Sequence, residues 1–111
     1  RNMYAQFRMY NNLFLTIFST YAPHADRESN IKDQYYQELQ QHLDDTTGLG
    51  PTLLAGDFNT RLGTPENVNE ATVLGRHSLL PTTPITYSDN VRDNRDRLIN
   101  FALKNNLSIY N

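Results

Sequence analysis

The residues of this chain whose types and spacing could do chemistry are Asp57 and Asn59, which one aromatic residue separates. They follow Gly56 and the apolar run of residues 52–55, which has the length of a buried strand. Gly56 allows the backbone to leave the sheet with little steric restriction. If the chain stays extended, the side chains at 57 and 59 point the same way, and a carboxylate and an uncharged hydrogen-bond donor share one rim.

A simpler interpretation is that Asp57 and Asn59 satisfy backbone groups in a turn, as most Asp and Asn residues that follow a strand do. The four residues 56–59 by themselves leave both interpretations open. The predicted secondary structure on either side of these residues is needed to distinguish a turn from a functional site.

Two strands are predicted before this stretch. Residues 3–10 alternate between apolar and polar side chains, which is the period of a half-exposed strand, and Asn11-Asn12 is typical of a tight turn. Residues 13–20 are apolar on both faces, which predicts a strand covered on both sides and paired antiparallel with the first. Pro23 ends that strand because it cannot donate to a sheet ladder.

An amphipathic helix is predicted next, because apolar residues recur every four positions from Ile31 to Leu43. Its length is about four to five turns at roughly 3.6 residues per turn. Asp26 or Ser29 is expected to cap its start, and Gly48 stops it. His42 lies beside the apolar stripe, which favours a structural role.

The order hairpin, helix, strand forms a crossover unit. A crossover brings the carboxyl ends of two parallel strands to the same edge of the sheet. Tyr21 leaves one of these ends, and Asp57 and Asn59 leave the other, so the three residues should meet at one rim. Ligands of open α/β sheets bind at that edge.

The remaining third of the chain is less regular. Residues 60–86 show no sustained period and are predicted to form a long loop, in which residues 73–74 and 79–80 anchor to the core. A second helix is expected from Asp93 or Asn94 to Asn105, followed by a strand from residue 107. The run of residues 89–97 mixes three Asp with three Arg, which predicts a solvated helix start with local ion pairs.

Composition narrows the classes of function. A chain of 111 residues has the length of one domain, and its net charge of −2 argues against a module that grips nucleic acid by charge alone. The argument is weaker against a metal-dependent enzyme, in which acidic groups hold the cation. The absence of Cys excludes disulfides, thiolate metal sites and cysteine nucleophiles, and is compatible with a reducing compartment. No apolar stretch has membrane-spanning length, so no membrane partner is expected.

Several motifs together resemble the middle of the endonuclease/exonuclease/phosphatase family. They are Thr-Tyr-Ala-Pro at residues 20–23, Leu-Ala-Gly-Asp-Phe-Asn at 54–59, and the pattern from Arg97-Leu98 to residues 107–111. The most similar variant is the endonuclease domain of non-LTR retrotransposons. The resemblance implies a two-sheet β-sandwich flanked by helices, a four-layer α/β/β/α, DNase I-like fold. Residues 1–111 would be a single partial domain that lacks family segments at both ends.

The resemblance also implies an activity, namely Mg²⁺-assisted or Mn²⁺-assisted hydrolysis of DNA phosphodiester bonds. Asp57 resembles the carboxylate that orients or deprotonates the attacking water, and it could touch the metal indirectly. Asn59 resembles the amide that contacts the scissile phosphate and places Asp57, and Tyr21 resembles the phosphate-contacting phenol. The family's main metal ligands, a Glu and an Asp-His pair, would lie beyond both ends. A fused reverse transcriptase domain is the partner that the resemblance implies.

Weaker candidates are Arg61 and His77, which we expect to contact substrate. His24, His42 and His77 are too scattered for a recognisable metal-ligand spacing. The chain also departs from the retroelement pattern, since Asn94 is followed by Arg95 where a Gly is usual.

Two alternatives remain. The chain could belong to a lipid or inositol-phosphate phosphoesterase of the same family, or it could be a non-catalytic relic or interaction fragment of the same fold. The isolated 111 residues are expected to be inactive. If flanking strands are missing, uncovered sheet faces would also favour aggregation.

Overall fold

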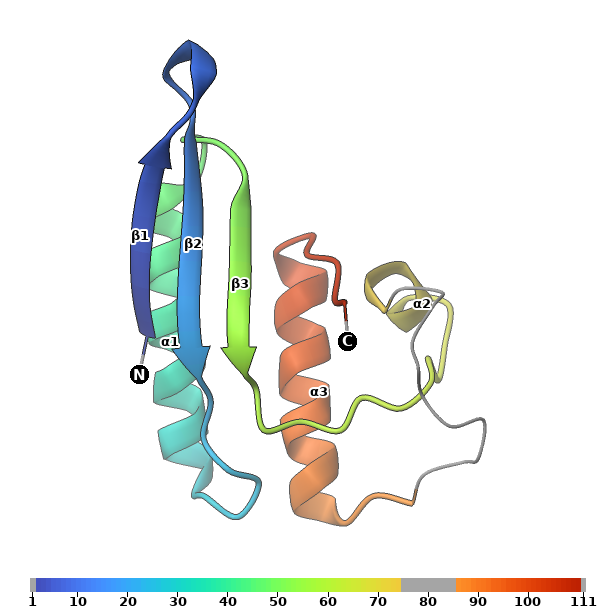
Figure 1. The fold of residues 1–111 in the computed structure, drawn as a ribbon. Coiled ribbons are helices and arrows are strands. Elements are labelled where there is room, and N and C mark those ends of the chain that lie inside the picture. The colour runs from blue at the N-terminus through green and yellow to red at the C-terminus, as the bar shows by residue number, and fades with distance from the viewer. Residues whose placement is uncertain (1, 75–85, 111) are drawn as a thin grey trace. The chain divides into compact units, whose positions relative to one another are not determined.

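Three strands and a long helix make up the first part of the chain (Figure 1). The computed structural model describes residues 2–74 and 86–110, and the chain divides into two units, residues 1–59 and 60–111. The first unit contains β1 (Asn2–Arg8), the short 3-10 turn η1 (Tyr10–Asn12), β2 (Phe14–Tyr21), α1 (Ser29–Thr46) and β3 (Thr52–Asp57). The second contains α2 (Glu70–Val73) and α3 (Asp89–Lys104).

The sheet has the order β1-β2-β3 and is mixed. β1 pairs with β2 antiparallel, and β2 pairs with β3 parallel through the crossover helix α1. Both pairings agree with the sequence prediction. Asn11 and Asn12 make the hairpin turn with φ of 61° and 59°, left-handed conformations that Asn tolerates better than most residues do. The fold is therefore a small α/β fold.

Helix α1 covers one face of this sheet. Its residues Tyr35, Leu39 and Leu43 are buried, as the periodicity predicts, and Phe18 of β2 is fully buried. The Tyr4 ring of β1 lies 5.2 Å from that of Phe18 and 5.7 Å from that of His42, measured between ring centroids. Burial of this apolar stripe, rather than local propensity, holds the helix in place.

The start of α1 differs from the prediction. Neither Asp26 nor Ser29 caps it, because Glu28 occupies the N-cap position and no side chain makes a capping hydrogen bond. Instead, the buried Lys32 donates from Nζ to the carbonyl of Ala25 at 2.8 Å. This bond fastens the loop that precedes α1 to the helix itself.

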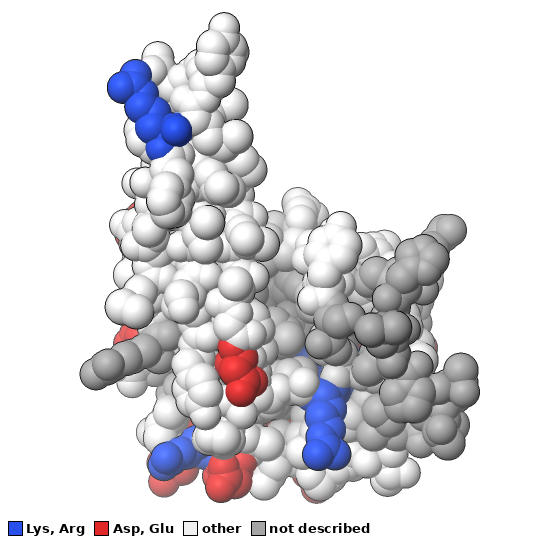
Figure 2. Space-filling model, viewed as in Figure 1, with Lys and Arg blue, Asp and Glu red and all other residues white. Residues whose placement is uncertain are grey.

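The opposite face of the sheet is apolar and exposed. Met3, Phe7 and Leu53 are 68%, 54% and 53% exposed, and Ser19 of β2 is exposed as well. The prediction that β2 is covered on both faces is therefore wrong for the described residues. Figure 2, viewed from the side opposite α1, shows few charged side chains over the strands. The alternation in β1 is real, but its apolar side faces outward while Tyr4 faces the helix.

The second unit is built on α3. This helix begins at Asp89, four residues before the predicted Asp93, and buries an apolar stripe of Leu98, Ile99, Phe101 and Ala102. The predicted strand from residue 107 is reduced to a single parallel bridge between Leu74 and Ile109. No helix within the described residues has the length and apolar character needed to cross a bilayer.

Candidate functional site

The two strand ends that the sequence places at one rim do lie together. Tyr21 and Asp57 are the last residues of β2 and β3, and they are direct partners in the parallel register. Both strands finish at the same edge of the sheet (Figure 1). Tyr21 is 51% exposed and Asp57 is exposed, so a phenol and a carboxylate face solvent side by side.

Asn59 is tied to this edge by hydrogen bonds. Its amide Nδ2 donates to the carbonyl of Ala22 at 2.7 Å, and the backbone N–H of Ala22 donates to the carbonyl of Asp57 at 2.8 Å. The backbone N–H of Asn59 also donates to Asp57 Oδ1 at 2.8 Å. We refer to Tyr21, Asp57 and Asn59 as the rim, and Ala22 is the residue that connects its members.

The backbone of residues 57–59 does not have the extended conformation that would place the two side chains on one side. Asn59 has a φ of 47°, so strand alternation does not place its side chain beside that of Asp57. The hydrogen bond from the Asn59 N–H to Asp57 Oδ1 is that of a turn, as the simpler interpretation expects, whereas the Asn59 side chain bonds to Ala22 in a distant part of the chain. The turn uses Oδ1 of Asp57, and no hydrogen bond of its Oδ2 occurs within residues 2–74 and 86–110. The carboxylate therefore retains an oxygen that can accept a proton or a hydrogen bond.

Gly56 brings the two strand ends close. It remains within β3 opposite Thr20, with a φ of 152° that disfavours any side chain. A Cβ at this position would collide with the Thr20 carbonyl oxygen. The glycine is therefore required for the close approach of β3 to β2, in addition to the freedom that the sequence suggested.

His24 joins the rim through Tyr21. The Tyr21 hydroxyl and His24 Nε2 are 3.0 Å apart, and the two rings meet edge to face with centroids 6.0 Å apart. His24 follows Tyr21 by three residues, and the structure brings its imidazole into hydrogen-bond contact with the Tyr21 hydroxyl. Sequence reasoning missed Ala22, because only its backbone acts and its side chain carries no indication of that role.

The other sequence candidates have different places. Arg61 is exposed and belongs to the second unit, and the hydrogen bonds that define the rim do not include it. His42 packs against Tyr4, in agreement with a structural role. His77 lies outside the described residues.

The described residues contain no group of three or more His, Asp or Glu side chains that could hold a metal ion. At the rim, the oxygen donors are the Asp57 carboxylate and the Asn59 amide. These are the hard oxygen ligands that Mg²⁺ accepts, but two side chains do not complete its octahedral shell. The rim therefore fits a metal only as part of a larger ligand set.

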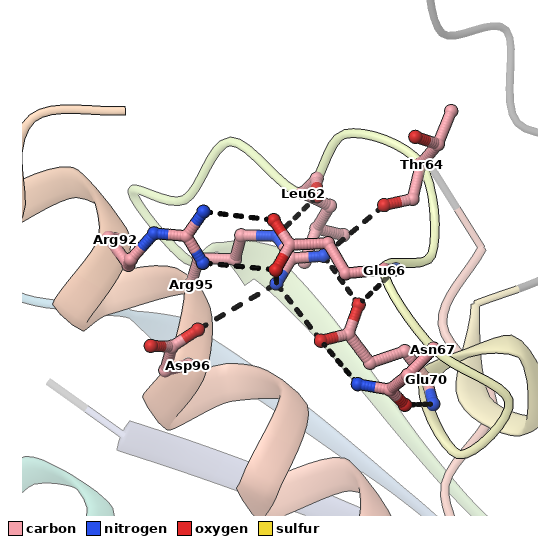
Figure 3. Close-up of polar contacts among 8 residues, drawn as sticks. All are labelled: Leu62, Thr64, Glu66, Asn67, Glu70, Arg92, Arg95 and Asp96. Carbon is pink, nitrogen blue, oxygen red and sulfur yellow. Dashed lines mark hydrogen bonds and ion pairs between the residues drawn. The ribbon is translucent and has the colours of Figure 1, made fainter. Parts of the chain in front are cut away.

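A second polar group, which we call the Arg95 cluster, lies in the second unit (Figure 3). Arg95 is fully buried, and its guanidinium contacts the Glu70 carboxylate at 2.6 and 3.2 Å. It also donates to the carbonyls of Leu62 and Thr64 at 2.7 and 3.3 Å. The predicted solvated helix start is thus wrong for Arg95, which lies within α3 and not at a turn.

Glu66 connects the cluster to the surface. It accepts two hydrogen bonds of 3.0 Å from Arg92 and lies 3.8 Å from Arg95. Hydrogen bonding to Arg95 holds the pKa of Glu70 below its usual value, and hydrogen bonding to Arg92 does the same for the pKa of Glu66. All these donors are engaged within the protein, so the cluster anchors residues 62–70 rather than offering cations to a ligand.

Comparisons of the chain with protein-family models, curated proteins and solved structures gave no match.

Proposed function

We propose that this chain is part of a metal-dependent phosphodiesterase, a DNA endonuclease of the retroelement type. The observation that carries the proposal is that Tyr21 and Asp57 are partners in the parallel register. Ala22 links Asn59 to this pair, because it is hydrogen-bonded both to Asn59 and to Asp57. The resemblance of these same residues to the endonuclease/exonuclease/phosphatase family supports it. The rim thus combines a carboxylate, a phenol and an amide at the sheet edge where ligands of α/β folds bind.

Each rim side chain has a defined task in this proposal. Asp57 Oδ2 accepts a proton or hydrogen bond from the attacking water, while Oδ1 stays bonded to the Asn59 backbone. Tyr21 donates its hydroxyl proton to a phosphoryl oxygen, on which negative charge develops in the transition state. Asn59 holds the β2 end through Ala22 and adds no negative charge near the anionic phosphodiester.

Mg²⁺ or Mn²⁺ is the implied cofactor. A bound divalent cation neutralises the phosphoryl oxygens and so permits attack by a water-derived nucleophile. Asp57 is the carboxylate of the rim that would assist in holding it. We propose that the remaining ligands come from segments outside residues 1–111.

The same proposal includes the finer architecture, a four-layer α/β/β/α sandwich. Its support is the exposed apolar face of the sheet, which carries Met3, Phe7 and Leu53 opposite α1. An exposed apolar surface of this kind marks a contact with another part of a protein. A second sheet packed on this face would bury these side chains and complete the sandwich.

The test is a nicking assay on supercoiled DNA with and without Mg²⁺. We expect a protein extended beyond both ends of residues 1–111 to nick, and the isolated 111 residues to show no significant turnover. Replacement of Asp57 or Asn59 by Ala should abolish nicking by the extended protein, because the water-activating group or the frame that holds it is lost. Asp45→Ala, at an exposed position of α1, is the matched control and should remain active.

Cleavage that survives both Asp57→Ala and Asn59→Ala would contradict the proposed function. It would favour the alternative in which Asp57 and Asn59 form only a turn. Metal-dependent nicking by the isolated chain would instead contradict the expectation that further ligands are needed.

A further inference from the structure

A pocket of about 380 Å³ lies in the first unit, beside the rim. It is formed by the loop that follows β2 and by the first turns of α1. The residues that matter for its chemistry are Tyr21, Ala22, Ile31, Gln34, Tyr35 and Glu38. A pocket of this volume can hold a ligand the size of a nucleoside.

The pocket is continuous with the rim. Tyr21 belongs to both, and Ala22, which lines the pocket, is held by Asp57 and Asn59 through hydrogen bonds of 2.8 and 2.7 Å. A phosphate that contacts Tyr21 therefore has its neighbouring nucleoside at the mouth of this pocket.

The walls of the pocket are fixed by buried polar contacts. The Tyr35 hydroxyl and Thr20 Oγ1 are 2.6 Å apart, and burial raises the pKa of Tyr35, so the phenol stays neutral. Lys32 fastens the loop to α1 through Ala25. The pocket is thus largely preformed, which lowers the ordering cost of binding.

One edge of the pocket carries an oriented carboxylate. Gln34 Nε2 donates to Glu38 Oε1 at 2.9 Å, which orients the carboxylate. Each carboxylate oxygen has two lone pairs, so Oε1 and Oε2 can together still accept two hydrogen bonds from a ligand. On its Watson–Crick edge, guanine has two adjacent donors, N1–H and N2–H, which match the two oxygens of a carboxylate. On the same edge of each other base, an acceptor lies next to the donor. Arg27 also lines the pocket, and its positive charge offsets the repulsion between Glu38 and a nucleotide phosphate.

We propose that this pocket binds a guanine base, that of the nucleotide next to the scissile phosphate, with Glu38 reading its Watson–Crick edge. The inference rests on the proposed function only in that it takes the neighbouring phosphate to be the one that is cleaved. The binding of a guanine nucleotide can be measured without any cleavage.

The experiment titrates the protein with dGMP, dAMP, dCMP and dTMP and follows backbone amide shifts by NMR. We expect dGMP to shift the amides of residues 21, 22, 24 and 31–38 at the lowest concentration. Glu38→Gln should weaken dGMP binding about fivefold, the lower end of the range for a bidentate base contact, since Glu38 is exposed. Gln34→Glu, which sets a second carboxylate beside Glu38, is a second variant that should also weaken binding.

The matched control is Asp45→Asn. Gln41 donates to Asp45 at 2.9 Å in the same i, i+4 arrangement on α1, but neither residue lines the pocket. Its dGMP affinity should equal that of the unmodified protein. A dispersed amide spectrum for each variant shows that it has folded.

A parallel nicking assay, with the protein extended beyond both ends of residues 1–111, varies the base beside the cleaved bond. Binding of dGMP through residues 31–38 without nicking would uphold the pocket and defeat the proposed function. The pocket assignment would be overturned, and the proposed function left intact, by nicking that shows no preference for guanine. In that case the four nucleotides would shift the amides equally, or would shift amides outside the pocket. Equal dGMP affinity of the Glu38→Gln and Asp45→Asn variants would also overturn it.

Discussion

The rim and the Arg95 cluster are both groups of polar side chains, yet their exposure and hydrogen bonding are opposite in kind. At the rim, Tyr21 and Asp57 are exposed partners whose side chains face solvent. In the cluster, Arg95 is fully buried and bonded to Glu70, Leu62 and Thr64. Tyr21 and Asp57 are therefore accessible to solvent, whereas Arg95 finds its partners within the protein.

This difference shows that a high density of charged residues does not mark a site. Residues 89–97 hold three Asp and three Arg, whereas the rim holds one carboxylate. What separates them is where the partners come from. Arg95 finds its partners 25 to 33 positions away in the chain, at Glu70 and Leu62. Asp57 is bonded within its own turn and keeps one oxygen exposed.

The largest predicted effect tests the structural side of this comparison. Arg95→Met should lower the free energy of unfolding by about 3–5 kcal/mol, because Glu70 would be left as a nearly buried, unpaired carboxylate. Urea denaturation monitored by circular dichroism measures the change. Arg92→Ala is the control, since Arg92 is 45% exposed and its ion pair with Glu66 is screened by water. Equal losses for the two variants would show that burial does not distinguish them.

The next effect concerns the approach of the strands at the rim. Gly56→Ala should cost about 3 kcal/mol, since it combines a disfavoured φ of 152° with a collision against the Thr20 carbonyl. Gly48→Ala provides the comparison, because its φ is 81° but no atom lies within 4 Å of the added Cβ. That change should cost about 1–2 kcal/mol from backbone conformation alone. If thermal denaturation gives the same loss for both, close strand approach is not what requires Gly56.

Asn59→Ala should have a smaller effect on stability, about 1–2 kcal/mol. It removes the hydrogen bond to Ala22 and places Ala at a φ of 47°, which Asn adopts more readily. Hydrogen exchange of the Ala22 N–H, which donates to the Asp57 carbonyl, should speed up, because Ala22 loses one of the two hydrogen bonds that hold it at the end of β2. Unchanged exchange at Ala22 would mean that Asn59 does not hold the end of β2.

The smallest effect is the acid sensitivity of the Arg95 cluster. The pKa of Glu70 is lowered from its usual 4.5, first by its hydrogen bond to Arg95. Folding therefore favours the charged form, and this stabilisation is fully present above about pH 4.5 and is lost as the pH falls through the lower folded-state pKa. Urea midpoints between pH 7 and pH 3 should decline less steeply for Glu70→Gln than for the unmodified protein. Parallel declines would exclude Glu70 as a source of the acid sensitivity.

Much of the first unit could be predicted from the sequence, because its determinants are local. Alternation in residues 3–10, the Asn-Asn turn and the four-residue period of α1 fix the elements, and chain order then fixes the parallel partnership of Tyr21 and Asp57. Which side of β1 faces outward was not predicted. Alternation divides a strand into two sides but does not say which side the helix covers.

The second unit was less predictable because its determinants are long-range. Helix α3 begins at Asp89, and the side chain of its N-cap residue, Ser88, makes no capping hydrogen bond. The burial of Arg95 depends on Glu70 and on two backbone carbonyls from a segment without a period. At the rim, the left-handed Asn59 could not be inferred, because an extended chain and a turn fit the same residues.

The measurement that tests the central claim most directly is the nicking rate of Asp57→Asn in the extended protein, with its unfolding free energy measured on the same sample. The substitution keeps an oxygen that can accept from the Asn59 N–H, so the turn is retained, but it removes the proton acceptor. We predict a loss of at least about 100-fold in rate with unchanged stability. A rate within a few fold of the unmodified protein, at equal stability, would show that the rim is a turn and not an active site.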